Sequence, residues 1–166
     1  KQMLLLLQDR ARDLGVELKF ETEVDDIDAL KQEYDLVVAA DGINSKTRKR
    51  YEHAFKPEID TRACKFVWLG THAKFDDAFT FIFKNTEHGW IWAHAYQFDA
   101  DTATFIVECA EDTWLNFGFD KMDQKEMIAV CEKVFADHLD GHALMSNAKH
   151  LRGSAWLNFN RVLCEK

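Results

Sequence analysis

Four runs of alternating apolar residues constrain the fold of this chain more than any other feature. The runs are residues 65–71, 79–84, 90–98 and 103–109. Residues 85–89 separate the second run from the third, and residues 99–102 separate the third from the fourth. Both linkers have the length and the turn-forming residues of hairpin loops. The pattern predicts a mostly antiparallel sheet whose neighbouring strands are joined by hairpins.

Aromatic side chains occupy alternate positions in these runs, so they gather on one face of each predicted strand. They are Phe66, Trp68, Phe79, Phe81, Phe83, Trp90 and Trp92. The same period of two places His94 and Tyr96 on the face that carries Trp92. Such a face is compatible with a core packed against helices and with the wall of a pocket that binds an aromatic ligand. The pattern leaves both interpretations open.

Helical spacing of apolar residues marks two segments outside the predicted sheet. Residues 1–14 predict one helix, and Gly15 follows it at the usual stop position. Residues 123–140 predict a second, because Asp123 and Glu126 have the spacing of a capping box. Alternating apolar residues return near the end of the chain and predict a final strand within residues 153–166.

A short apolar run at residues 35–40 ends at Asp41-Gly42. It predicts a strand buried on both faces and followed by a tight turn. With the first helix and a half-buried strand over residues 16–20, it fits the second half of a nucleotide-binding α/β unit. An acid and a glycine at the carboxyl end of such a strand lie where open α/β sheets bind ligands. An ordinary strand, turn and capped helix would show the same local pattern.

The residues after this turn are basic in an otherwise acidic chain. Asn44 or Ser45 can cap a short helix. That helix carries Lys46, Arg48, Lys49 and Arg50. The basic side chains either face solvent or attract the phosphate groups of a cofactor or substrate.

Composition excludes several classes of function. The 166 residues carry a net charge of −8, which disfavours general binding to nucleic acid or to anionic membranes. No apolar run reaches membrane-spanning length. The four cysteines are widely spaced, without a Cys-x-x-Cys pair, and indicate packing cysteines of a reduced, cytoplasmic protein. His138 and His142 flank Gly141, which favours a solvated helix end, so no metal site is predicted.

Several segments together resemble a known family. Residues 35–48, with Asp41-Gly42 and Arg48, resemble the internal Asp-Gly motif of the FAD-dependent aromatic hydroxylases, the para-hydroxybenzoate hydroxylase group. Residues 66–72, 86–90 and 150–155 resemble one branch of that family, the aryl-CoA monooxygenases. This branch includes salicylyl-CoA 5-hydroxylase and 2-aminobenzoyl-CoA monooxygenase. The resemblance covers nearly the whole chain.

The resemblance implies an α+β fold made of three parts. Residues 1–50 would be a partial α/β FAD-binding segment with the Asp-Gly motif. Residues 51–152 would be the substrate-binding domain, an antiparallel sheet packed by helices, including the helix 123–140. Residues 153–166 would be a strand leading back to the FAD domain. The amino-terminal glycine-rich fingerprint and the later Gly-Asp motif of the family are absent from this sequence, which suggests an internal fragment.

The resemblance also implies cofactors and site residues. Asp41 and Gly42 match the motif used at the FAD and NAD(P)H site. Arg48 matches a basic position implicated in pyridine-nucleotide binding, and Val24 falls where the main chain lies near the adenine.

The resemblance and the strand face that carries the aromatic residues together predict which residues contact the substrate. Phe83, His94 and Tyr96 fall on sheet positions that face the substrate ring in the para-hydroxybenzoate enzyme. Trp92 shares the face of His94 and Tyr96. That enzyme presents an arginine to the substrate carboxylate where this chain has Tyr96, which argues against a free carboxylate and is compatible with an aryl-CoA thioester. His94 is the candidate catalytic group, because a neutral imidazole can accept a proton near pH 7.

These implications predict a fragment of a monooxygenase that uses NAD(P)H and O₂. The isolated chain is expected to be inactive, to bind FAD weakly or not at all, and to self-associate or form a homo-oligomer through exposed apolar surface. Two alternatives stay open: a free-standing binding module with an aromatic-lined sheet, and a flavin oxidoreductase of the same fold, such as a halogenase or epoxidase.

Overall fold

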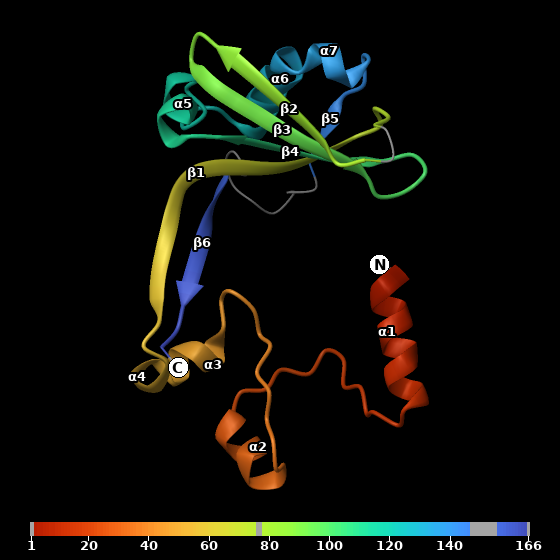
Figure 1. The fold of residues 1–166 in the computed structure, drawn as a ribbon, viewed down its shortest axis with the longest axis vertical. Helices are drawn as coiled ribbons and strands as arrows, with labels where there is room; N and C mark the ends of the chain where they lie inside the picture. Colours follow the sequence, from red (N-terminus) through yellow and green to blue (C-terminus); the bar gives the residue numbers. More distant parts are fainter. Residues whose placement is uncertain (1, 76–77, 147–155, 166) are drawn as a thin grey trace. The chain divides into compact units, whose positions relative to one another are not determined.

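The computed structural model describes residues 2–75, 78–146 and 156–165. It divides into two compact units, Lys1–His53 and Ala54–Lys166 (Figure 1). Each unit is described by itself.

The second unit is built on an antiparallel sheet of six strands (Figure 1). The strands are β1 Glu58–Thr71, β2 Thr80–Thr86, β3 Gly89–Gln97, β4 Ala103–Cys109, β5 Leu144–Met145 and β6 Leu157–Leu163. Their order is β2-β3-β4-β1-β5, and β6 pairs with β1. The sheet is curled, with a register shift between Thr61 and Lys65 where β1 pairs with β6. The four strands predicted between residues 65 and 109 are confirmed.

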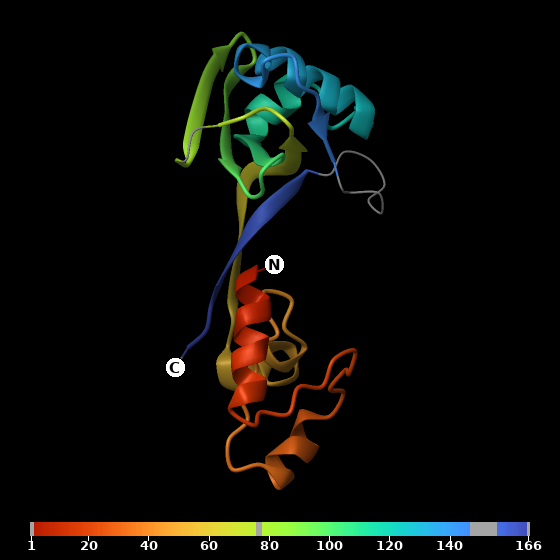
Figure 2. The ribbon, with the colours of Figure 1, turned by 90° about the vertical axis from the view of Figure 1, so that its right-hand side faces the viewer.

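Three helices, α5 Glu111–Asn116, α6 Gln124–Val134 and α7 Ala136–Leu139, cover one face of this sheet (Figure 2). The predicted capping box begins α6, because Asp123 accepts from the Glu126 N–H and the Glu126 side chain accepts from the Asp123 N–H. The helix predicted over 123–140 divides at Phe135 into α6 and α7. Within the described ranges, no helix is both long and apolar enough to cross a bilayer.

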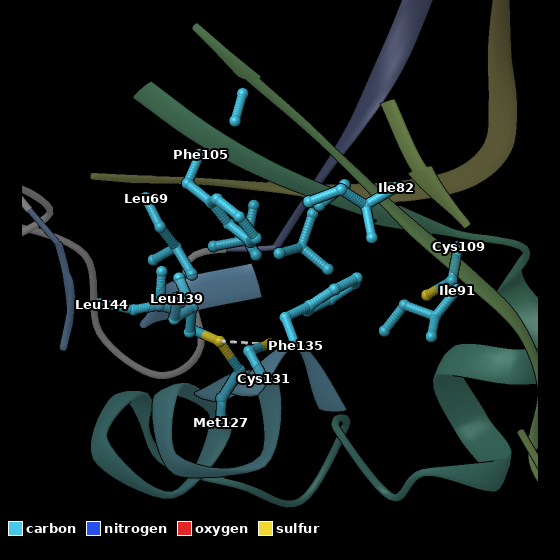
Figure 3. Packing of buried hydrophobic residues seen from close by; sticks show 14 of the residues in the cluster. Leu69, Ile82, Ile91, Phe105, Cys109, Met127, Cys131, Phe135, Leu139 and Leu144 are labelled. Atoms are coloured by element: carbon cyan, nitrogen blue, oxygen red, sulfur yellow. Dashed lines mark hydrogen bonds between the residues drawn. The ribbon is translucent and has the colours of Figure 1, made fainter. Parts of the chain in front are cut away.

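The core lies between the helices and the sheet face made by Ile91, Ala93 and Ala95 of β3, all fully buried. Figure 3 shows Phe105 and Ile82 from the strands pointing toward side chains of the helical layer. Small side chains at Ala93 and Ala95 leave room for that layer to pack closely against the strand. The aromatic residues at the alternate positions of the strands lie on the opposite face of the sheet, away from the helices, and several of them are exposed. The interpretation of the aromatic face as core packed against helices is therefore wrong.

Two of the four cysteines belong to this core. Cys109 and Cys131 are buried free thiols, whereas Cys164 is exposed. Burial raises the pKa of Cys109 to about 12 and also raises the pKa of Cys131. The prediction of packing cysteines is confirmed for these two, and a thiol held in its neutral form is a poor nucleophile.

The first unit contains three helices, α1 Gln2–Asp13, α2 Ile27–Glu33 and α3 Lys46–Arg50, and α4 Glu52–Phe55 follows at the boundary between the units. The helix predicted over 1–14 is confirmed by α1. The acidic segment between residues 21 and 33 contains α2, which is capped by the Asp26 side chain.

The strand predicted over residues 35–40 is wrong, and so is the strand over residues 16–20. Both segments are irregular in the structure, and Leu36 and Val38 are 78% and 77% exposed. A strand requires a neighbour to satisfy its backbone N–H and C=O groups. The described residues of this unit include no partner strand. The fold is therefore mixed α+β, without the α/β segment expected over residues 1–50.

Candidate functional site

The face of the sheet opposite the helices carries a cluster of aromatic and polar side chains. The register of β3 and β4 pairs Trp92 with Glu108, His94 with Ile106 and Tyr96 with Thr104. On the other side of β3, Phe83 is opposite Trp92 and Phe81 is opposite His94. Because successive side chains alternate between faces, all of these side chains lie on the same side of the sheet. We call this side the aromatic face.

A carboxylate joins two of the predicted site residues on the aromatic face. The Trp92 Nε1–H donates to Glu108 Oε2 at 3.0 Å. The other carboxylate oxygen, Oε1, lies 3.5 Å from His94 Nδ1. The side chains of His94 and Glu108 are only 17% and 16% exposed. This geometry gives an acid, an imidazole and an indole in one half-buried group.

Aromatic rings surround that group. The Phe79 ring stacks on the imidazole of His94, with centroids 5.3 Å apart, and on the ring of Tyr96 at 4.9 Å. Phe81 contacts His94 at a centroid distance of 5.9 Å. Phe81 and Phe83 are 59% and 60% exposed, which is unusual for phenylalanine on a folded surface. Such an exposed aromatic patch is typical of a binding surface.

A cavity of about 460 Å³ lies at the part of the same sheet where β1 pairs with β4. It is lined by Trp68, Leu69, Gly70, Phe98, Thr102, Thr104 and Met145. Thr104 is the register partner of Tyr96, so the cavity adjoins the predicted substrate residues. Apolar walls with a few hydroxyl groups are the usual lining of a small-molecule site.

In the first unit, the Asp41-Gly42 segment forms a closed loop at the start of α3. Gly42 has a φ of +77°, which favours glycine. The Ser45 side chain accepts from the Arg48 N–H at 2.8 Å and caps the helix, as predicted. Hydrogen bonds from the Ser45 side chain and from the backbone N–H of Thr47 lower the pKa of Asp41 to about 2.

Three basic side chains near this loop, those of Lys46, Arg48 and Arg50, contact partners within the first unit. The Arg48 guanidinium donates to the backbone carbonyl groups of Gly42 and Ile43. Lys46 pairs with Glu23, and Arg50 pairs with Asp28 at 2.7 Å. Lys46 and Arg50 thus pair with acidic residues of the first unit, while their side chains stay 76% and 48% exposed and still face solvent. Arg48 therefore stabilises the loop. To bind a pyridine nucleotide, as predicted, its guanidinium group would either leave these carbonyl groups or contact the nucleotide from its present position.

A cavity of about 480 Å³ lies beside this loop, entirely within the first unit. Its apolar walls include Val24, Ile27 and Leu30, and its polar residues include Asp41 and Asn44. Two of the predicted cofactor residues, Val24 and Asp41, therefore line one cavity. A third, Gly42, is in the loop next to it.

The structure thus gathers the predicted residues into two groups. Phe83, Trp92, His94 and Tyr96 lie on the aromatic face, and Val24, Asp41, Gly42 and Arg48 belong to the loop and cavity of the first unit. Among the described residues, no group of three or more His, Cys, Asp or Glu side chains is arranged to hold a metal.

Glu108 is the site residue that the sequence analysis missed. It is the single charged residue in the strand Ala103–Cys109. An acid in a strand that is otherwise buried requires a partner. The hairpin between β3 and β4 could have identified that partner, because its register places Glu108 opposite Trp92.

Comparison with known proteins gives related sequences. No protein-family model matches the chain. It is 37% identical to a salicyloyl-CoA 5-hydroxylase from a Streptomyces species, over 96% of this chain and 31% of the relative. It is 34% identical to protodeoxyviolaceinate monooxygenase from Chromobacterium violaceum, over 92% of this chain and 40% of the relative.

A third relative, from Streptosporangium sibiricum, is 3-hydroxy-4-methyl-anthranilyl-(aryl-carrier protein) 5-monooxygenase. It is 30% identical over 98% of this chain and 40% of its own length. The chain therefore spans between about a third and two fifths of the relatives it matches. Over nearly its full length, the chain is homologous to salicyloyl-CoA 5-hydroxylase and other aromatic monooxygenases.

Proposed function

We propose that this chain is an internal part of an FAD-dependent monooxygenase that hydroxylates an aromatic substrate, with NAD(P)H as reductant and O₂ as the source of oxygen. The observation that carries the proposal is the aromatic face, where Glu108, His94 and Trp92 form a polar group among exposed rings. The homology to aromatic monooxygenases supports the same reaction class.

We further propose that the substrate is an aryl-CoA thioester. Tyr96 supports this choice, because it offers a phenol where the para-hydroxybenzoate enzyme offers a cation to a free carboxylate. Two of the relatives are named for aryl groups carried by CoA or by a carrier protein. A thioester places its charged groups far from the ring, so the ring site itself requires no arginine.

The residues of the first unit fit part of a flavin dinucleotide. The cavity beside the Asp41 loop combines apolar walls, suited to a planar ring, with a carboxylate whose lowered pKa keeps it ionised and able to accept hydroxyl donors. Val24 and Asp41 would line the site, and Gly42 would allow close approach of the backbone. When bound, FAD supplies the oxygen-transfer chemistry that amino-acid side chains lack.

The side chains of the sheet would then bind and orient the substrate ring. Phe83 and Trp92 would stack against it and exclude water, and Tyr96 would fix its orientation through the phenol group. His94 would accept a hydrogen bond or a proton from a ring substituent.

The proposal is tested with the complete polypeptide from the reading frame that contains this sequence. We expect aryl-CoA-dependent oxidation of NAD(P)H and incorporation of one atom of ¹⁸O₂ into the ring, measured by mass spectrometry. Salicyloyl-CoA and 2-aminobenzoyl-CoA are the first substrates to compare, with the free acids as controls. A complete protein that contains flavin and oxidises NAD(P)H without inserting oxygen into any aryl thioester or free acid would refute the hydroxylase assignment.

The isolated chain is expected to be inactive, to bind FAD weakly or not at all, and to self-associate. The helix α1 exposes Met3, Leu4 and Leu7, and the aromatic face adds further apolar surface. Sedimentation velocity and the flavin absorption spectrum of the purified chain test these expectations. A strictly monomeric chain with one FAD per molecule would contradict them.

A further inference from the structure

We infer that Glu108 is a positioning residue that holds His94 with Nε2 available as a proton acceptor for a hydroxyl or amino group on the substrate ring. The inference deepens the proposed function and rests on it for the identity of the substrate. Its geometric basis does not depend on the flavin.

The sheet register places the two side chains together. Glu108 is opposite Trp92, and His94 lies two residues further along β3, so Glu108 and His94 are diagonal neighbours on one face. Diagonal neighbours in an antiparallel pair are within reach of long side chains. The contact between Glu108 Oε1 and His94 Nδ1 therefore follows from the strand pairing itself.

The Trp92 indole fixes the orientation of the carboxylate. Its Nε1–H donates to Glu108 Oε2 at 3.0 Å, and the other carboxylate oxygen, Oε1, lies 3.5 Å from His94 Nδ1. The imidazole is also stacked against the Phe79 ring. The acid and the imidazole are therefore both held by neighbours.

The environment strengthens the electrostatic interaction. Both side chains are more than four-fifths buried, so solvent and salt screen their interaction less than on an open surface. A carboxylate next to Nδ1 favours the tautomer that carries its proton on Nδ1. The lone pair on Nε2 is then free. The same arrangement orients histidines that bind metals, where an acid contacts the ring nitrogen that is not used.

This orientation of His94 allows a proton to pass from the substrate to the imidazole. The O–H or N–H bond of the ring substituent breaks, a bond between that proton and His94 Nε2 forms, and the electron pair stays on the substrate. The ring becomes richer in electrons and more reactive toward an electrophilic oxygen. The Glu108 carboxylate lies 3.5 Å from Nδ1 of the imidazolium that results. Only rings that carry a hydroxyl or amino group can donate this proton, so the proposed substrates are hydroxyaryl and aminoaryl compounds.

The first test requires neither flavin nor substrate. In ¹⁵N–¹H correlation spectra of the chain at about pH 9, well above the ordinary imidazole pKa of about 6.5, His94 is expected in the Nδ1–H tautomer. Glu108→Leu removes the acceptor at similar volume and is expected to move His94 toward the Nε2–H tautomer that predominates for histidine in water. Glu87→Leu is the matched control, because Glu87 contacts His88 in the same unit with an 88% exposed side chain, and it should leave the His94 signals unchanged.

An Nε2–H tautomer of His94 in the unmodified chain would overturn the inference even if the Glu108→Leu variant does not fold. An unchanged tautomer in a folded Glu108→Leu variant would also overturn it.

The second test uses the complete monooxygenase. Glu108→Leu is expected to lower kcat at least 10-fold on a hydroxyaryl thioester with little change in KM, and Glu108→Asp is expected to recover part of that loss. Equal losses with both variants, or a loss confined to KM, would contradict a positioning role. If the complete protein hydroxylates no aryl thioester while His94 still shows the Glu108-dependent tautomer, the proposed function fails and the positioning of His94 stands.

Discussion

Replacement of Phe105 by alanine is expected to lower the free energy of unfolding of the sheet unit by about 3–5 kcal/mol. Phe105 is fully buried in the core between sheet and helices. Its ring meets Phe135 edge-on at a centroid distance of 5.4 Å and lies 6.0 Å from Phe75. Truncation removes these contacts and leaves a cavity that the rigid strand cannot close. Denaturation monitored by circular dichroism measures the loss.

Phe83→Ala is the matched control for this prediction. The same side chain is removed from the aromatic face of the same sheet, where Phe83 is 60% exposed. We expect a loss below about 1 kcal/mol, because little buried surface disappears. Equal destabilisation by the two substitutions would contradict the assignment of one face to the core and the other to a ligand.

Gly89→Ala is expected to destabilise the same unit by at least about 2 kcal/mol. Gly89 begins β3 with a φ of +118°, a conformation that residues with side chains rarely adopt. A Cβ atom there would lie 2.4 Å from the Oγ1 atom of Thr113, which is itself buried in α5. The substitution therefore adds a steric clash to backbone strain. The affected contact joins α5 to the hairpin that carries the aromatic face.

Gly141→Ala separates the effect of backbone strain from the effect of the steric clash. Gly141 also has a positive φ, +77°, but no atom lies within 4 Å of a Cβ placed there. We expect a smaller loss of about 1–2 kcal/mol, from backbone conformation alone. Thermal denaturation of both variants gives the comparison. A Gly89→Ala variant no less stable than Gly141→Ala would show that the hairpin and α5 do not pack as described.

The sheet could be predicted because its signals are local. Alternation defined the strands, and the loops at residues 85–89 and 99–102 defined the hairpins. The capping box at Asp123 predicted the start of α6 for the same reason. The direction of the aromatic face could not be read from alternation, since that pattern only separates two faces. The small residues Ala93 and Ala95 decide it, because they let the helical layer approach the other face.

In the first unit, local sequence signals were not sufficient to predict the structure. The apolar run at residues 35–40 has the composition of a buried strand, but a strand forms only when another strand satisfies its backbone, and composition does not supply that partner. Likewise, the Asp41-Gly42 loop was predicted, but the hydrogen bonds from the Arg48 guanidinium to the carbonyl groups of Gly42 and Ile43 were not. Glu108 was missed because its role depends on the pairing of β3 with β4.

We propose that the aromatic face holds the substrate ring of a monooxygenase. Turnover by the complete enzyme carrying His94→Ala, compared with His138→Ala, tests this claim. His138 is a histidine of the same unit, on α7, with a partly exposed side chain. We predict that His94→Ala lowers kcat for hydroxylation at least 100-fold, as expected for loss of a proton acceptor, and that His138→Ala leaves it unchanged. Wild-type turnover in a folded His94→Ala enzyme would contradict the claim.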